Sequence, residues 1–363
     1  MKNTFGNNVS VTLFGESHGE AIGAVIDGLA PGINIDLEFI KEKLSLRRPS
    51  GNISTSRREP DEFKILSGVF EGKTTGTPIC IMIPNVNKQS KDYSNVIGKA
   101  RPGHADFAAF AKYHGNEDYR GGGHFSGRIT AALVAVGAVC QMALQNKGIY
   151  IGTHIKSIAD IKDRDFANVY EDIKLIEKEN FPLLDKGKET EMKNIIEKAR
   201  EELDSVGGRL QTAIVGIPAG VGEPWFDSME SVISHAVFSV PAVKGIEFGA
   251  GFGFANMKGS RANDSFFMDG EEIKTKTNNN GGINGGITNG SPIVFNTVIK
   301  PTPSIAKTQN TVDFINKTNA EIQITGRHDP CIVHRAASVI NSLCAITVCD
   351  MLATRFGTDF LGE

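Results

Sequence analysis

The stretch Ile129–Asn146, ITAALVAVGAVCQMALQN, is apolar on nearly every side when it is drawn as a helix. A helix of this kind has no face for water and is therefore expected inside a protein. Gly148 follows it where a glycine commonly ends a helix. The range Arg335–Phe356 has the same character and is followed by Gly357, so the sequence predicts two buried helices.

The segments around these two helices show both strand and helix patterns. Asp36–Leu46 has helical spacing, and the charged, amphipathic range Asp185–Val206 predicts a helix at the surface. Strands are predicted where β-rich residues alternate or run together, at Val9–Phe14, Ala21–Leu29, Phe63–Phe70, Ile79–Ile83, Leu210–Pro218 and Ile293–Ile299. Because strands and helices occur in mixed runs rather than in strict alternation, the pattern indicates the α+β class. We find no repeat of fixed period and no clear linker, so residues 1–363 are expected to form a single domain.

The composition is typical of a globular, enzyme-sized protein. The chain has 363 residues, of which 40% are hydrophobic and 22% charged. Its net charge of -3 argues against nucleic-acid binding through bulk basicity. The first residues lack a signal-peptide pattern, and no stretch is expected to reach the ~18 apolar residues of a membrane span. Five scattered cysteines fit reduced thiols rather than a disulfide frame or a metal site, so a cytoplasmic protein is expected.

A glycine-rich segment, Arg120–Arg128 (RGGGHFSGR), precedes the first buried helix. Its three consecutive glycines allow the backbone to approach a ligand closely, while arginine and histidine supply donors for anionic oxygens. We expect the glycines to open onto the N-terminus of that helix, which is an environment suited to phosphate. Taken alone, the segment predicts an anion site without specifying a reaction.

Histidines and arginines gather beside such segments. Of the eight histidines, six lie in or next to glycine-containing motifs: His18, His104, His114, His124, His328 and His334. Nine arginines do the same: Arg47, Arg48, Arg57, Arg58, Arg101, Arg120, Arg128, Arg327 and Arg335. Guanidinium groups bind carboxylate and phosphate through paired donors, so this clustering predicts a ligand with several anionic groups. Asp106 is interpreted as the partner of a nearby arginine, and Asp329 as a functional carboxylate, with an ion pair as its alternative.

One motif also fits a different enzyme class. Gly15–Gly19 (GESHG) matches the nucleophile elbow of α/β-hydrolases, and a predicted strand precedes it. However, only fourteen residues come before Gly15, and Ala21–Leu29 reads as a strand where that elbow requires a helix. The pattern therefore disfavours a hydrolase.

Taken together, the motifs of this chain resemble those of the chorismate synthase family. The resemblance runs from the first ten or so residues to the mid-350s, in the family's order and spacing. It is carried by Phe14–Gly19 (FGESHG), Leu66–Gly72 (LSGVFEG), Arg101–Asp106 (RPGHAD), Tyr119–Gly123 (YRGGG), Val221–Pro224 (VGEP) and Gly326–Cys331 (GRHDPC). It implies a β-α-β sandwich, with helices held between antiparallel sheets, and a homotetramer.

The resemblance also implies an activity. Members of the family convert 5-enolpyruvylshikimate 3-phosphate to chorismate by an anti-1,4-elimination of phosphate and a C6 hydrogen, the last common step of the shikimate pathway of aromatic amino acid biosynthesis. The reaction needs reduced FMN although it has no net redox change. No Rossmann fingerprint is present, so the flavin follows from the resemblance alone. No nicotinamide motif stands out either, so NADPH is expected to act indirectly, through an external flavin reductase.

Residue roles follow from matching positions. In the roles implied by the resemblance, His18 protonates or stabilises the departing phosphate, His104 lies by the flavin ring, and Asp329 with flavin N5 assists removal of the C6 proton. The implied substrate-binding residues are Arg47, Arg48, Arg128 and Arg335. The implied FMN-binding residues are His124, Phe125, Ser126, Pro241, Ala242, Gly285, Lys300, Pro301, Thr302, Pro303, Ser304 and Arg327. Gly285 lies in Asn278–Gly290, whose composition is also typical of a flexible loop.

Four positions depart from the family pattern. Many members have arginine where this chain has His124 and serine where it has Phe125, so these contacts are expected to be made by the backbone. Asn52 stands near the position of a common arginine, and Asn341 where a glutamate is common. Two other classes stay open on the residues alone: a flavin-dependent oxidoreductase and a non-catalytic anion-binding protein.

Overall fold

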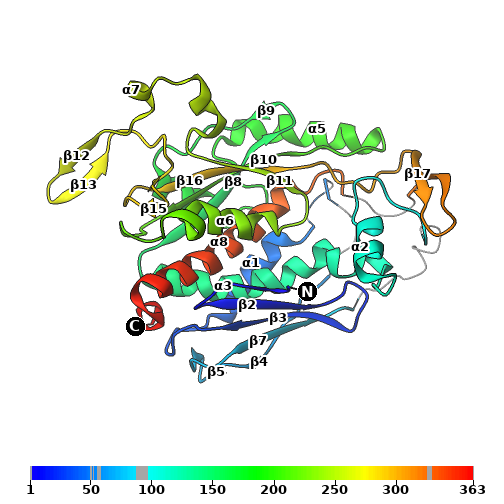
Figure 1. The fold of residues 1–363 in the computed structure, drawn as a ribbon, viewed down its shortest axis with the longest axis horizontal. Helices are drawn as coiled ribbons and strands as arrows, with labels where there is room; N and C mark the ends of the chain where they lie inside the picture. Colours follow the sequence, from blue (N-terminus) through cyan, green and yellow to red (C-terminus); the bar gives the residue numbers. More distant parts are fainter. Residues whose placement is uncertain are drawn as a thin grey trace.

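The computed structural model describes residues 2–49, 51, 53–54, 59–86, 97–324 and 329–362. Its main features are two five-stranded antiparallel sheets with long helices packed between them (Figure 1). This arrangement confirms the predicted α+β class and the sandwich implied by the family resemblance.

The first sheet is built mainly from the N-terminal part of the chain. In spatial order its strands are β1 (Thr4–Phe5), β2 (Ser10–Gly15), β3 (Ala21–Asp27), β7 (Ile79–Pro84) and β4 (Lys64–Ser67). The first two predicted strands, Val9–Phe14 and Ala21–Leu29, correspond to β2 and β3, which pair with Ser10 opposite Asp27 and Gly15 opposite Ile22. The predicted strand Phe63–Phe70 is broken at Gly68, whose φ of 80° places it in the left-handed region, and β5 (Val69–Phe70) pairs instead with β6 (Lys73–Thr74).

The second sheet comes from the middle of the chain. Its strands, again in spatial order, are β11 (Val243–Phe248), β16 (Ile293–Ile299), β10 (Gly208–Val215), β8 (Tyr150–Ile158) and β9 (Ile161–Lys162). The two strands predicted here correspond to β10 and β16, whereas β8 and β11 were not predicted. On the outer face of this sheet lie α4 (Val169–Ile176) and α5 (Glu189–Glu201), both packed against β8.

The predicted surface helix is shorter than expected. The helical pattern covers Asp185–Val206, but α5 begins only at Glu189. Asp185 instead caps a short 3-10 turn, accepting a hydrogen bond from the Gly187 N–H at 2.9 Å.

Four helices lie between the sheets or against them: α1 (Leu37–Arg47), α3 (Thr130–Asn146), α6 (Met229–Phe238) and α8 (Val333–Phe356). Of these, α3 packs against β3 and β7 of the first sheet, and α8 packs against β8 and β10 of the second. Asp36 caps α1 by accepting hydrogen bonds from the Glu38 and Phe39 N–H groups. The predicted buried helices are therefore the two central layers of the sandwich.

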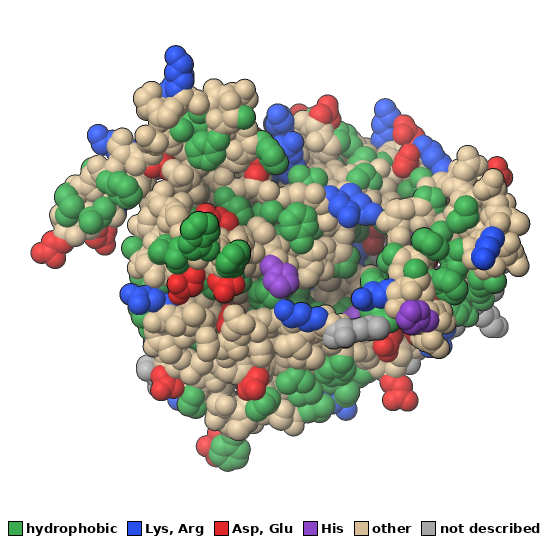
Figure 2. All heavy atoms as spheres, viewed as in Figure 1, with side chains coloured by type: hydrophobic (Ala, Val, Ile, Leu, Met, Phe, Trp, Pro, Cys, Tyr) green, Lys and Arg blue, Asp and Glu red, His purple; other side chains and the backbone are tan. Residues whose placement is uncertain are grey.

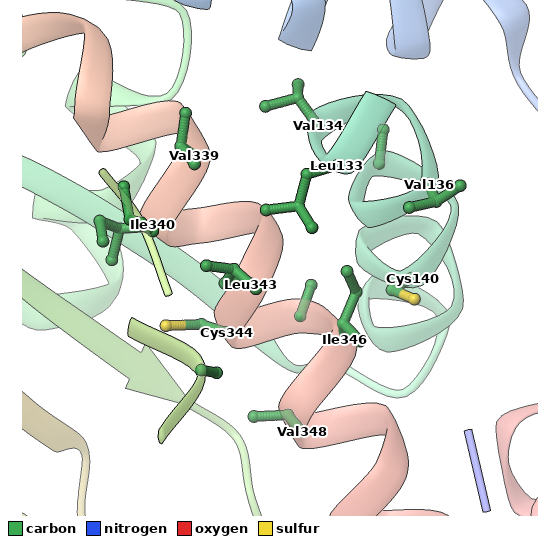
Figure 3. Close-up of a cluster of buried hydrophobic side chains, with 14 of the residues drawn as sticks. Leu133, Val134, Val136, Cys140, Val339, Ile340, Leu343, Cys344, Ile346 and Val348 are labelled. Atoms are coloured by element: carbon green, nitrogen blue, oxygen red, sulfur yellow. The ribbon is translucent and has the colours of Figure 1, made fainter. Parts of the chain in front are cut away.

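The contact between α3 and α8 is unusually close at one point. Figure 3 shows Leu133 and Cys140 of α3 beside Leu343 and Ile346 of α8, all of them buried. At the crossing, a Cβ atom added to Gly137 would lie 2.7 Å from Cα of Ser342. Close-packed interiors have no room for such an overlap, so glycine at this position sets the distance between the helices.

Judged by length and composition alone, two helices are apolar enough to span a membrane, so the expectation that none would be is wrong. Gly127–Asn146 and Val333–Phe356 have mean hydropathies of 1.6 and 1.7 and are long enough to cross a bilayer. Their apolar windows are, however, 89% and 94% buried inside the protein. Helices in the core of a protein can have the same length and apolar composition as membrane-spanning helices, since burial against other elements demands apolar side chains on all sides.

The remaining elements are short. They are α2 (Asp106–Tyr113), α7 (Gly259–Ala262), the hairpins β12–β13 (Phe266–Asp269 and Glu272–Thr275), β14–β15 (Ile283–Asn284 and Ile287–Thr288) and β17–β18 (Gln309–Asp313 and Thr318–Ile322), and several 3-10 turns. The β12–β13 hairpin projects from the body of the molecule, whereas α2 and the β17–β18 hairpin lie at its opposite end (Figure 1).

Candidate functional site

Three central helices bring their ends together at one end of the sandwich. Arg47, the last residue of α1, donates to the carbonyl of Gly127, just before α3, at 3.4 Å. In turn, Arg335 in the first turn of α8 donates from Nε to the Arg47 carbonyl at 2.9 Å. The N-termini of α3 and α8 therefore meet here, and each carries the partial positive charge of a helix N-terminus.

A buried carboxylate joins two of the predicted substrate arginines. Asp61 accepts a hydrogen bond from Arg47 at 3.1 Å and another from Nη1 of Arg128. Both arginines are less than one-tenth exposed. Burial lowers the pKa of Arg47 to about 10; Asp61 opposes this effect, and the charges of Arg335 and Arg128 add to it. Burial alone would raise the pKa of Asp61, but Arg47 and Arg128 outweigh it and hold that pKa below its ordinary value.

Asp329 belongs to the same cluster. Its carboxylate accepts a hydrogen bond from Nη1 of Arg335 at 2.7 Å, so the ion pair considered as its alternative role is present. The cluster Arg47, Asp61, Arg128, Asp329 and Arg335 is here called the arginine cluster. Its three guanidinium groups outnumber its two carboxylates, and together with two helix N-termini this favours an anionic ligand.

The three consecutive glycines form a left-handed turn. Gly121, Gly122 and Gly123 have φ values of 59°, 83° and 53°, a region that residues with a Cβ rarely adopt. The turn does not open directly onto a helix, as the sequence suggested, because a 3-10 turn at Gly127–Ile129 intervenes before α3 begins. The glycines instead provide a surface against which histidine rings can lie.

His18 lies on this turn. The loop Glu16–Gly19 follows β2, and the Ser17 N–H donates to the Gly123 carbonyl at 3.1 Å. A Cβ atom at Gly121 would overlap the His18 ring, so only glycine leaves room for it. The next element is the strand β3 rather than a helix, which rules out the hydrolase elbow for Ser17.

His104 lies on the same turn, at the neighbouring glycine. A Cβ atom at Gly122 would be 3.4 Å from both Cε1 and Nε2 of the His104 ring. On its other side, Nδ1 of His104 donates to Asp106 at 2.7 Å, and Arg101 donates to the same carboxylate at 2.6 and 2.8 Å. Burial alone would raise the pKa of Asp106, but the hydrogen bonds from Arg101 and His104 hold it well below its ordinary value. The expected arginine partner of Asp106 is thus confirmed, and Nε2 of His104 is directed towards the glycine turn.

One group of the predicted FMN-binding residues reaches Gly103, the residue before His104, through Lys300 and Pro303. Lys300 donates from Nζ to the Gly103 carbonyl at 2.6 Å and from its backbone N–H to the Ala242 carbonyl at 2.9 Å. These contacts bring together Pro241, Ala242, Lys300, Pro301, Thr302, Pro303 and Ser304. The hydroxyl of Thr302 is buried and has no hydrogen-bond partner among the described residues.

The second predicted FMN segment has structural contacts of its own. His124 donates from Nδ1 to the Gly15 carbonyl at 2.8 Å, which ties the glycine turn to the end of β2. The ring of Phe125 packs edge-on against Tyr113, and the Ser126 hydroxyl accepts the Arg128 N–H at 3.3 Å. The segment His124–Ser126 nevertheless adjoins the glycine turn, because Ser126 lies beside Gly122.

Gly285 is not brought to these residues within one chain. It lies in the turn between β14 and β15, where the neighbouring Gly286 carbonyl accepts the Met229 N–H at the start of α6. The strand β16 separates this turn from Lys300, a distance of roughly 20 Å along the strand. The surrounding loop is held in place, since Asp264 accepts the N–H groups of Asn279 and Asn280 at 2.7 and 2.8 Å, which argues against the flexible alternative.

Some predictions cannot be placed, and two residues of the site were missed. Arg327 and the departure at Asn52 lie outside the described residues.

Asp61 and Asn85 are the two site residues that the sequence analysis missed. Both contact Arg128 directly, yet neither belongs to a recognisable pattern in the sequence. A carboxylate two residues after Glu59 and a lone asparagine after a strand are ordinary features of any chain.

The space-filling view shows a hollow on one face of the molecule. The face in Figure 2 is hollowed between the body of the molecule and the part that carries α2, and Lys, Arg and His side chains lie around the hollow. Of the side chains that form the site, His18 and Arg128 are buried, while His104 keeps about a fifth of its surface exposed (19%).

Known proteins share both the sequence and the fold. The family model described as chorismate synthase matches residues 9–353. A chorismate synthase of Methanococcus maripaludis is 48% identical over 362 residues, covering 96% of this chain and 97% of the relative. One of Thermococcus kodakarensis is 42% identical over 350 residues, with coverage of 96% and 97%. A crystal structure of chorismate synthase matches with a TM-score of 0.77 and 30% identity, over 97% of this chain and 94% of that one. This chain therefore belongs to the chorismate synthase family of lyases.

Proposed function

We propose that this chain converts 5-enolpyruvylshikimate 3-phosphate to chorismate and inorganic phosphate, and that it requires reduced FMN to do so. The C3–O bond breaks with its electron pair leaving on phosphate, the C6–H bond breaks, and a second ring double bond forms. The observation that carries the proposal is the placement of two histidines, His18 and His104, on one glycine turn. The arginine cluster is linked through Asn85 to the loop that carries His18. A substrate with two carboxylates and one phosphate suits a site of this charge.

The residues around His104 fit a flavin. The buried Thr302 hydroxyl without a described partner and the nearby Lys300 amine supply donors of the kind that a phosphorylated cofactor needs. The proposed FMN contacts are those with His124–Ser126, Pro241–Ala242, Gly285, Lys300–Ser304 and Arg327. When it is bound, reduced FMN supplies transient electron donation that helps the C–O bond to break.

The histidines are proposed to manage protons. His18 protonates or stabilises the departing phosphate from a buried loop, where water competes little for its proton. His104 is proposed to lie by the flavin ring, with its tautomer fixed by the bond from Nδ1 to Asp106, so that Nε2 faces the turn. Asp329 is proposed to assist removal of the C6 proton.

The arginines are proposed to bind the anionic groups of the substrate. Arg47, Arg128 and Arg335 lie in one cluster, and Arg48 follows directly after α1. Bidentate donors orient a planar carboxylate, and orientation before reaction lowers the barrier.

Assembly as a homotetramer is part of the proposal. Gly285 lies too far from Lys300 to share one flavin within a chain, so a second copy would supply it. Large exposed side chains support an interface, among them Trp225, Phe226 and Phe252, each more than four-fifths exposed. The β12–β13 hairpin adds the exposed side chains of Phe266, Met268 and Ile273, and Figure 2 shows hydrophobic side chains on the part of the molecule that projects there. Reduction of the flavin by an external reductase that uses NADPH is proposed as well.

An anaerobic assay tests the proposed function. Purified protein is mixed with photoreduced FMN and 5-enolpyruvylshikimate 3-phosphate, and chorismate absorbance and phosphate are followed together. We expect equimolar products with the flavin still reduced at the end. As a matched control, His114→Asn replaces an exposed histidine at φ 57°, a conformation that asparagine tolerates, and should keep native turnover.

The other outcomes separate the alternatives. Consumption of one equivalent of reduced flavin per turnover would indicate an oxidoreductase instead. Folded protein that binds FMN and substrate but releases neither product would indicate a non-catalytic anion-binding protein.

A further inference from the structure

Asn85 makes an unusual set of contacts at the centre of the site. It follows β7 directly and is only 6% exposed. Its Nδ2 donates to the Glu16 carbonyl at 2.9 Å and to the Gly19 carbonyl at 3.0 Å. Its Oδ1 accepts from Nε of Arg128 at 3.1 Å. One amide therefore contacts both ends of the loop that carries His18 and, on its other side, a member of the arginine cluster.

The chemistry of these contacts selects a carboxamide. Two carbonyl oxygens can only accept, and the Arg128 guanidinium can only donate, so the orientation of the amide is fixed by its partners. A carboxylate of the same shape would keep the bond to Arg128 but would place an oxygen against two carbonyl oxygens. The backbone is held as well, since the Asn85 N–H donates to the Glu20 carbonyl at 3.0 Å.

The position of Arg128 depends on the same neighbourhood. Besides Asn85, it donates to Asp61 and, at 3.3 Å, to the Pro84 carbonyl. Asn85 thus lies between a guanidinium that is fixed on three sides and a loop that is also tied to the glycine turn, through the bond from the Ser17 N–H to the Gly123 carbonyl. Among the described residues, Asn85 is the side chain that bonds to both.

We propose that Asn85 is a positioning residue that fixes the His18 loop relative to the arginine cluster. This inference rests on the proposed function, in which His18 acts on the phosphate of a substrate whose anions the arginines bind. If the loop moves while the substrate stays in place, His18 no longer lies within hydrogen-bond reach of the departing oxygen. A misplacement of about 1 Å can cost about 100-fold in rate, so the amide matters without touching the substrate.

A double-mutant cycle tests the coupling between Asn85 and His18. In the native background, Asn85→Ala is expected to lower kcat by about 10- to 100-fold. In a His18→Ala background the same change should lower kcat by less than about threefold, because there is no longer an imidazole to position. A merely structural role would lower kcat by the same factor in both backgrounds, and that result would overturn the proposal.

Asn85→Asp separates the two sides of the amide. It keeps an acceptor for Arg128 and removes both donors to the loop, so it should reproduce most of the loss in kcat, while its added negative charge beside Arg128 should also raise the KM for the anionic substrate. Asn116→Ala is the matched control, because Asn116 also donates to two backbone carbonyls, those of Tyr113 and His114, but at an exposed position outside the site. Native kcat in Asn85→Asp would contradict the proposal.

Hydrogen exchange gives a readout that does not depend on turnover. The Ser17 N–H donates to the Gly123 carbonyl at 3.1 Å, and the Gly19 N–H donates to the Glu16 carbonyl at 3.0 Å. Their exchange is expected to become about tenfold faster in both Asn85 variants and to stay native in Asn116→Ala. Unchanged exchange would overturn the proposal, whether or not the variants retain activity.

The two proposals can fail separately. If the native chain makes no chorismate, the proposed function falls, and the exchange experiment alone then decides whether Asn85 fixes the loop. If the native chain is active but the cycle shows no coupling, the proposed function stands and the role of Asn85 falls.

Discussion

His18 and His104 lie on the same glycine turn but are held there in opposite ways. His104 is fixed by Asp106 and Arg101, all within six residues of one another along the chain. The loop that carries His18 is held by Asn85 and by Gly123 of the turn, which lie far away in the sequence. The His104 half of the site is therefore set by residues that are close together in the sequence, whereas the His18 half forms only once the first sheet has formed.

The largest expected effect comes from removing either histidine. His18→Ala and His104→Ala should each lower kcat by about 10²–10⁴-fold, the usual contribution of a well-placed acid or base. FMN should still bind, because most of its proposed contacts lie outside both side chains. Turnover in the anaerobic assay and the absorbance of bound flavin check this. Near-normal turnover in both variants would remove the two histidines from the mechanism.

Substitutions in the glycine turn compare the two histidines directly. Gly121→Ala and Gly122→Ala both place a Cβ at positive φ, which costs about 1–2 kcal/mol in each case. Only at Gly121 does the added atom overlap a ring, that of His18; at Gly122 the His104 ring is 3.4 Å away. We therefore expect Gly121→Ala to lose at least as much stability as Gly122→Ala, and to have a kcat that is about tenfold lower.

The measurements are thermal unfolding and kcat on the same preparations. Equal kcat in the two glycine variants would mean that the two histidines tolerate displacement equally, and the contrast between them would then have no functional consequence.

The same contrast explains what the sequence could predict. The apolar ranges that became α3 and α8 were recognisable because burial on all sides leaves a continuous local signal. The His104 block was also recognisable, since its partners are adjacent in the sequence. Asn85 and Asp61 were missed because a single polar residue acquires its role only from the segments that packing brings to it. The strand β11 was missed for a related reason: it includes Lys244 and Gly245 and lies at the edge of its sheet, so its apolar pattern is weak.

Gly137 in the core should behave differently from the glycines of the site. Gly137→Ala adds a Cβ against Cα of Ser342, so it is expected to destabilise the fold by about 1–3 kcal/mol even though alanine favours helices. Its kcat should stay native at temperatures where the protein is folded. Gly259→Ala in α7 is the matched control, because nothing lies within 4 Å of its added Cβ. Urea unfolding decides this, and a stabilised Gly137→Ala would mean that α3 and α8 can move apart without cost.

The smallest expected effect concerns the charge beside His104. The pKa of Asp106 is lowered from its ordinary value of 3.8, so its ionised form stabilises the native state. That contribution is fully present above the pKa of the unfolded chain and is lost as the pH falls through the native pKa. Asp106→Asn should therefore be less stable than the native protein by about 1 kcal/mol at pH 7, since the pair is partly exposed. The difference should shrink as the pH falls from 4 towards 3, which urea midpoints at each pH would show. If the difference in stability between Asp106→Asn and the native protein grew as the pH fell, the ionised Asp106 carboxylate beside His104 would not be the group that stabilises the native state.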